Sequence, residues 1–150
     1  MAKNGSGAMK ALARGFTLIE LLVAMAILAV LLRIAVSSYT SSVAKTKRRA
    51  AEACLANYGT YMERYYTTNL TYVGMDNTAL TALGLDCASA AQTGSDYTYS
   101  FTATPTAAAF TLQAVPGTVQ SGRDARCGTL TLDQTGNRGI SGSSTVADCW

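Results

Sequence analysis

GFTLIELLVAMAILAVLLRIA, residues 15–35, is the stretch of the chain that decides its fold. It belongs to an apolar run from Phe16 to Val36 in which only Glu20 and Arg33 are charged. As a helix this run is about 30 Å long, which is enough to cross the hydrocarbon core of a membrane. An isolated carboxylate in hydrocarbon costs several kcal/mol. Glu20 therefore either pairs with a cation or lies at the membrane surface, with the span beginning deeper in the chain.

Helical patterning continues beyond the apolar run. Between Ala44 and Tyr66 the chain has no proline and a single glycine, Gly59. One helical face there carries Ala51, Cys54, Leu55, Tyr58, Met62 and Tyr65. We therefore expect one helix from about Phe16 to Tyr66, apolar all round in its first half and amphipathic in its second. A small head cannot cover so long a helix, so the first half must be buried in lipid or against other helices.

The remainder of the chain predicts a small antiparallel sheet. Residues 96–104 (DYTYSFTAT) alternate in polarity, and residues 110–115 (FTLQAV) follow a loop with Pro105, so the two segments should form a hairpin. Residues 129–133 (TLTLD) predict a third strand. A long helix followed by consecutive strands is typical of an α+β fold in which the sheet packs on the amphipathic part of the helix.

Two further segments have weaker patterns. Asp76 or Asn77 is a candidate N-cap for a short helical turn that ends near Gly84. The Gly- and Ser-rich tail, residues 134–150, is expected to be loop.

Composition excludes several classes of function. The chain of 150 residues has a net charge of +3, and Lys3, Lys10 and Arg14 lie before the apolar run, so the rest is balanced. This gives only weak support for a nucleic-acid partner. There is no histidine, which removes Ser-His-Asp and Cys-His catalysis and histidine-based metal sites. Since no nucleophile–base pair or metal cluster emerges, we expect no enzyme activity, no cofactor and no metal.

The four cysteines predict disulfides. They are Cys54, Cys87, Cys127 and Cys149, and no two form a CxxC pair. An even number of cysteines behind an export signal indicates an oxidising compartment. The number alone leaves all three pairings open.

Two motifs carry a resemblance to a known family. The segment from Gly15 to Glu20 (GFTLIE), followed by the apolar run, resembles the class III signal of type IV pilins. The segment CGTLTLDQTGNRG…DCW, from Cys127 to Trp150, resembles the end of the pilin group that includes some minor pilins and DNA-uptake pilins. The resemblance covers nearly the whole chain. It implies a leader over 1–15, a hydrophobic membrane and filament-core helix over 16–36, an amphipathic half over 37–66 and a head over 67–150.

The resemblance implies how this chain is processed and assembled. A prepilin peptidase would cut between Gly15 and Phe16 and N-methylate Phe16. Glu20 would then pair with the Phe16 amine of an adjoining subunit. The leader would stay in the cytoplasm, which gives an orientation that the flanking charges do not decide. Before assembly the chain would sit in the inner membrane with a periplasmic head, and afterwards in an extracellular pilus. Its partners would be copies of itself, related pilins and the pilus assembly platform.

The resemblance also pairs the cysteines and shows two departures. It implies a closing disulfide between Cys127 and Cys149, which leaves Cys54 to pair with Cys87. Where the family commonly has helix-loosening glycine and proline, this chain has Ala29 and Ser37, so the helix should be more continuous. Arg33 either extends toward the membrane surface or finds an acid inside the filament.

The leading functional hypothesis is a structural subunit of a type IV pilus, with adhesion, twitching motility and uptake belonging to the filament. One alternative is a minor pilin that acts as a DNA receptor, with Arg123, Arg126 and Arg138 as candidate DNA contacts. The basic cluster at residues 45–49 (KTKRR) is either a solvated helix face with internal salt bridges or a phosphate contact. Another alternative is a type II secretion pseudopilin. Many of these bind calcium in the C-terminal region, and the Cys127–Cys149 pair argues against that.

Overall fold

A computed structural model describes residues 15–150 of the chain. Apart from Gly15, the leader predicted over 1–15 lies outside the described residues. The chain divides into two compact units, residues 1–37 and residues 38–150. We describe each unit by itself.

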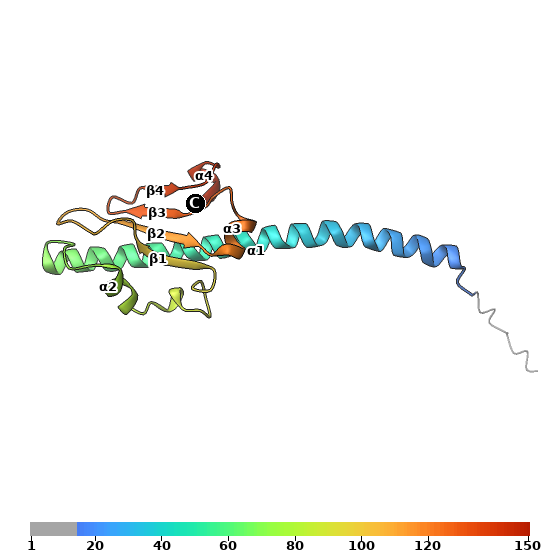
Figure 1. Cartoon of the computed structure of the whole chain (residues 1–150), viewed down its shortest axis with the longest axis horizontal. Coiled ribbons are helices and arrows are strands. Elements are labelled where there is room, and N and C mark those ends of the chain that lie inside the picture. The colour runs from blue at the N-terminus through green and yellow to red at the C-terminus, as the bar shows by residue number, and fades with distance from the viewer. Residues whose placement is uncertain (1–14) are drawn as a thin grey trace, which may run out of the picture. The chain divides into compact units, whose positions relative to one another are not determined.

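Helix α1 (Leu18–Asn69) is the longest element, with 52 residues. Its bounds agree with the predicted helix from Phe16 to Tyr66 to within a few residues. It continues through Ala29 and Ser37 without interruption, as expected from the absence of glycine and proline at these positions (Figure 1). Backbone hydrogen bonding along this part of α1 is therefore regular, because no residue there lacks an amide donor.

In the first unit, the described side chains of residues 15–37 are exposed. Gly15, Phe16 and Thr17 precede α1 in irregular structure, and the Thr17 hydroxyl accepts a hydrogen bond from the Glu20 amide at 3.3 Å. This contact satisfies one of the amides that a helix leaves free in its first turn. By length and composition α1 can cross a membrane.

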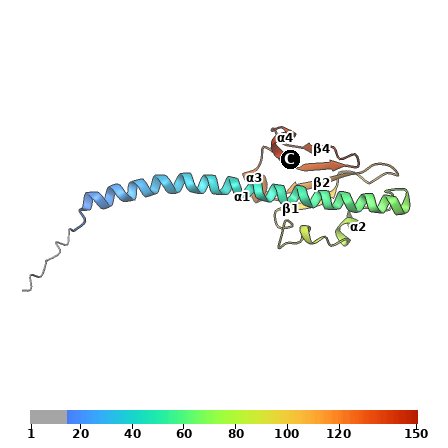
Figure 2. The ribbon, with the colours of Figure 1, turned by 180° about the vertical axis from the view of Figure 1, so that it is seen from behind.

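In the second unit, α1 buries one face against a four-stranded antiparallel sheet (Figure 2). The strands are β1 (Tyr97–Phe101), β2 (Thr111–Pro116), β3 (Leu130–Asp133) and β4 (Arg138–Ile140), in the order β1-β2-β3-β4. The predicted hairpin is present, since Tyr99 of β1 lies opposite Ala114 of β2. The fold is therefore the predicted α+β arrangement.

The core lies between α1 and the sheet. The buried residues of α1 in this core are Ala51, Cys54, Leu55, Tyr58 and Met62. The strands contribute Tyr97, Phe101, Leu112, Ala114 and Leu130. The Tyr58 and Tyr99 rings pack with centroids 5.4 Å apart. Tyr65, predicted to face the sheet, packs at the edge of this core, and its hydroxyl donates to the Val73 carbonyl at 3.0 Å. The helical period of apolar residues thus directs α1 onto the sheet.

Short helices lie in two of the connections, between α1 and β1 and between β2 and β3. α2 (Asn77–Ala82) is capped by the Asp76 carboxylate, which accepts a hydrogen bond from the Ala79 amide at 2.7 Å, as predicted from its sequence. A 3₁₀ turn, η1 (Asp86–Ala88), follows, and α3 (Thr118–Arg123) joins β2 to β3. α3 was not predicted, because its Gly117 N-cap and Gly122 obscure the helical pattern.

The prediction that residues 134–150 are loop was wrong. They contain β4 and a last short helix, α4 (Val146–Cys149). The turn before β4 is built on Asp133, whose carboxylate accepts hydrogen bonds from the amides of Thr135 and Asn137. The N-cap of α4 is Thr145, whose hydroxyl accepts a hydrogen bond from the Asp148 amide at 3.3 Å. Both elements depend on such local side-chain caps and not on apolar periodicity.

Two disulfides close the head. Cys54 of α1 is bonded to Cys87, and Cys127 is bonded to Cys149. These are the two pairs expected from the sequence and the resemblance. The first ties the connecting region to α1, and the second ties the end of the chain to the segment before β3. In the chain-entropy estimate, the loop that Cys127 and Cys149 close stabilises the fold by roughly 3 kcal/mol.

Candidate functional site

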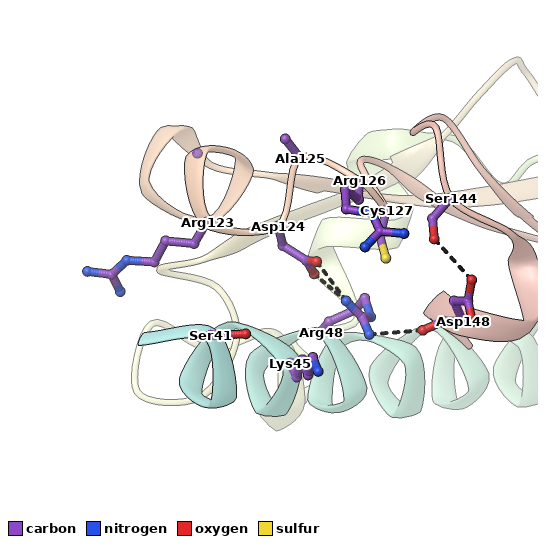
Figure 3. Close-up of a pocket in the computed structure, with 11 residues that line it drawn as sticks. Ser41, Lys45, Arg48, Arg123, Asp124, Ala125, Arg126, Cys127, Ser144 and Asp148 are labelled. Carbon is purple, nitrogen blue, oxygen red and sulfur yellow. Dashed lines mark hydrogen bonds and ion pairs between the residues drawn. The ribbon is translucent and has the colours of Figure 1, made fainter. Parts of the chain in front are cut away.

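The basic cluster at residues 45–49 is divided between internal and external roles. Arg48 is only 6% exposed and reaches from α1 to the segment after α3. Its Nη1 donates to both carboxylate oxygens of Asp124, each at 2.7 Å, and its Nη2 donates to the Asp148 carbonyl at 3.3 Å (Figure 3). The buried guanidinium is therefore compensated by charge and by hydrogen bonds.

Lys47 also has an internal partner. Its Nζ lies 2.6 Å from Asp96 Oδ1, just before β1. Lys45 and Arg49, in contrast, are exposed and have no ion pair among residues 15–150. The cluster thus contains two residues that hold the head together and two that face solvent.

A groove of about 600 Å³ opens beside Arg48. Its walls come from α1, from the segment that follows α3 and from the C-terminal disulfide loop. The charged residues that line it are Lys45, Arg48, Arg123, Asp124, Arg126 and Asp148. The Arg123 side chain extends away from the other residues, as Figure 3 shows. Arg48 is occupied by Asp124, so the cations available to a ligand are Lys45, Arg123 and Arg126.

Asp148 opposes these cations at the rim of the groove. Hydrogen bonds from the hydroxyls of Thr145 and Ser144 lower the pKa of Asp148 below its ordinary value, so it is ionised at neutral pH. The lining of the groove thus combines one carboxylate with three cations that have no ion pair among residues 15–150, although Arg123 extends away from the other two. The groove can attract an anion, and its guanidinium groups suit phosphate oxygens.

The structure does not place all three predicted arginines together. Arg123 and Arg126 line the groove, whereas Arg138 lies in β4 and lines a second groove with Arg49 and Trp150. The Arg138 guanidinium carbon lies 5.1 Å from the centroid of the Trp150 ring. The prediction that groups Arg138 with Arg123 and Arg126 does not include the pairing of β3 with β4, which places Arg138 beside Arg49 of α1.

The prediction places Lys45 and Arg48 in one basic cluster and does not show that their environments differ. A signal for Arg48 exists in the sequence. Ala44, Arg48, Ala51 and Leu55 recur at helical spacing, and all four are buried. A basic residue at a core position of an amphipathic helix needs an internal acid.

Phe16 and Glu20, the residues predicted for processing and assembly, lie in the apolar first part of the chain. Phe16 and Glu20 are exposed, and Glu20 has no ion pair among residues 15–150. Among the same residues, no group of three or more His, Cys, Asp or Glu side chains is placed to hold a metal ion.

The long helix, the four-stranded antiparallel sheet and the closing disulfide define a type IV pilin fold. Residues 37–131 match the family model described as "Type IV minor pilin ComP, DNA uptake sequence receptor", and residues 10–35 match the prokaryotic N-terminal methylation motif. The first match covers more than half of the chain, so the protein belongs to this type IV minor pilin family.

One solved structure supports the fold, and a second shows a weaker similarity. The chain is similar to the non-core minor pilin PilV of Neisseria meningitidis, with 21% identity, a TM-score of 0.52, and coverage of 70% of this chain and 93% of that chain. A type IV pilin from Shewanella oneidensis has 28% identity and a TM-score of 0.48, with coverage of 71% of this chain and 97% of that chain. A comparison with curated proteins found no match.

Proposed function

We propose that this chain is a minor subunit of a type IV pilus whose head binds DNA during uptake. The observation that carries the proposal is the match of residues 37–131 to the family described as a DNA uptake sequence receptor. The matched range includes the α1, α3 and post-α3 residues that line the first groove, among them Lys45, Arg123 and Arg126.

The chemistry of the groove supports contact with the phosphate backbone. Arg123 and Arg126 are exposed and lie on either side of Asp124 in the sequence. Asp124 is held by the bidentate contact to Arg48, and the next cysteine, Cys127, is held by the disulfide to Cys149. The segment that carries both arginines is thus fixed to α1 at one point and to the C-terminal loop at another. A fixed segment loses less conformational entropy when it binds a ligand.

The test is a salt titration of DNA binding. The full chain in non-ionic detergent micelles is mixed with a short labelled duplex, and affinity is measured by fluorescence anisotropy at several salt concentrations. Replacing Arg123 and Arg126 by alanine should weaken binding on every sequence tested. The negative slope of log K against log salt should become shallower by about 2. Arg64→Ala is the matched control, because Arg64 is an exposed arginine of α1 outside the grooves.

The contrary result is equally plain. If the double variant binds with the slope and affinity of the parent chain, these two arginines do not contact DNA. If the parent chain shows no affinity for duplex DNA at low salt, the receptor role itself is wrong.

We further infer that the chain is cleaved between Gly15 and Phe16, methylated at Phe16 and assembled through Glu20. The match to the N-terminal methylation motif over residues 10–35 supports this inference. A prepilin peptidase and the pilus assembly platform would act on the chain in the inner membrane, and the assembled subunit would lie in the extracellular pilus. Mass spectrometry of sheared filaments tests it. A mature N-terminus other than methylated Phe16 would contradict the processing step.

A further inference from the structure

The basic residues of the head are unevenly distributed. From Tyr65 to Gly122 the sequence contains no lysine or arginine. Within residues 15–150, basic side chains therefore come only from α1 and from the last 28 residues, Arg123 to Trp150. Lys47 and Arg48 are engaged in ion pairs with Asp96 and Asp124. The exposed basic residues of the second unit, residues 38–150, are Lys45, Arg49, Arg64, Arg123, Arg126 and Arg138.

Two of these residues line the second groove, which has a volume of about 290 Å³. Arg49 comes from α1 and Arg138 from β4, and Leu132 and Trp150 form an apolar wall. Arg138 lies opposite Leu132 in the pairing of β3 with β4. Two guanidinium groups from separate elements thus line one groove, and neither has an ion pair among residues 15–150.

Arg138 is held in place by Trp150. Its guanidinium lies over the indole ring at 5.1 Å, and the indole Nε1 donates to the Gly139 carbonyl at 3.1 Å. The preceding residue, Cys149, is fixed by its disulfide to Cys127. A cation that rests on an aromatic face keeps its outer N–H groups free to donate. Trp150 is therefore a positioning residue for Arg138.

Glu52 is the only carboxylate among the residues that line this groove. Burial raises its pKa above the ordinary value, although Arg48, Arg49 and Arg138 act in the opposite direction. Its Oε1 is buried and lies 3.6 Å from Arg48 Nε, on the side of the core. The two exposed arginines thus outnumber the one recessed acid, and the rim of the groove is basic.

Each groove has one exposed basic residue of α1 in its lining. Lys45 lines the first and Arg49 lines the second, and residues four apart on a helix have Cβ atoms about 6 Å from each other. Beneath them, Arg48 faces the core and is 6% exposed. The exposed cations therefore continue from one groove to the other across a single turn of α1.

We propose that a DNA duplex lies across this turn of α1 and that Arg49 and Arg138 contact a second stretch of its phosphate backbone. The proposal rests on the DNA-binding function proposed above and adds a site to it. The second groove holds phosphate without reading sequence, because its donors are guanidinium groups aimed at a charged backbone. The side of the head formed by residues 65–122 takes no part in backbone binding.

The experiment compares two double variants in the same salt titration of the full chain in detergent micelles. Arg49→Gln with Arg138→Gln should weaken binding on all duplexes alike. The negative slope of log K against log salt should become shallower by about 2. Arg64→Gln is the control and should retain the parent slope. Arg138→Lys should recover part of the loss caused by Arg138→Gln, because a lysine keeps the charge but stacks less well on Trp150.

Each outcome has one meaning. If Arg49→Gln with Arg138→Gln leaves the slope unchanged while Arg123→Ala with Arg126→Ala lowers it, the second site is wrong and the proposed function stands. If Arg64→Gln lowers the slope as much, binding follows overall charge and the second site is overturned. If the parent chain does not bind DNA, the proposed function fails first. Unfolding midpoints equal to that of the parent chain show that the variants are folded.

Discussion

The two halves of α1 differ in whether the chain supplies an ion-pair partner for a charge on an apolar face. In the second half, Arg48 is a cation on the core face, and the chain supplies its partner, Asp124, at 2.7 Å. In the first half, Glu20 and Arg33 interrupt an apolar surface, and the described residues supply neither with an ion pair. An internal partner compensates the buried charge within the second unit. A charge without an internal partner makes an apolar helix depend on another molecule.

The largest effect expected from this comparison is on assembly. Glu20→Gln should abolish surface filaments, because the amide cannot neutralise the α-amine proposed to face it. The measurement is the yield of sheared filaments, with the fold of the head checked by thermal unfolding. Glu63→Gln, on the second half of α1, is the control, since a glutamine oxygen can still accept the bond that Tyr72 donates. Normal filaments from the Glu20 variant would remove the distinction between the two halves.

A smaller effect, confined to the head, is expected at Arg48. Arg48→Met leaves the half-buried Asp124 carboxylate without its partner, so the free energy of unfolding should fall by about 3–5 kcal/mol. Denaturant unfolding measures the loss. Lys45→Met changes an exposed basic residue on the same helix and should stay within about 0.5 kcal/mol of the parent chain.

A double-mutant cycle sharpens the result at Arg48. Adding Asp124→Asn to Arg48→Met should restore part of the stability, because the uncompensated charge is removed. Equal losses from Arg48→Met and Lys45→Met would show that the ion pair has no special role.

The smallest effect is a pH dependence at Glu52. Burial raises the folded-state pKa of this carboxyl above its unfolded value. In the pH interval between these two pKa values, the folded chain therefore binds more protons than the unfolded chain. The contribution of Glu52 to the free energy of unfolding therefore falls as pH rises through the interval. Glu52→Gln removes this dependence and should be slightly more stable than the parent chain at neutral pH.

Denaturant unfolding of both proteins from about pH 4 to about pH 7 measures the difference. A difference that is constant over this range would show that the Arg48 contact fully offsets the burial of Glu52.

Some features of the fold could be read from sequence periodicity. The core face of α1, with Leu55 and Met62, follows the helical spacing of apolar residues, and the β1–β2 hairpin follows an alternation of period two. β4 has three residues and α4 has four, which is too short for either period to be detected. Their stability comes from capping side chains and from the Cys127–Cys149 bond.

The candidate site was only partly predictable for a similar reason. Arg123 and Arg126 are close in sequence and line the same groove. The β3–β4 pairing and the cation–π contact with Trp150 bring Arg138 next to Arg49, and both are long-range features. Local sequence reports which residues are basic, but tertiary packing decides which of them remain available to a ligand.

The Cys127–Cys149 bond has a consequence for timing. It fixes the wall that carries Arg126 and the tail that carries Trp150, so both grooves depend on an oxidised C-terminal loop. Disulfides of this kind persist outside the reducing cytoplasm. If the grooves bind DNA as proposed, a newly made chain would acquire that capacity only after its head has been exported. The cell's own chromosome would then be protected from its receptor by compartment and not by sequence.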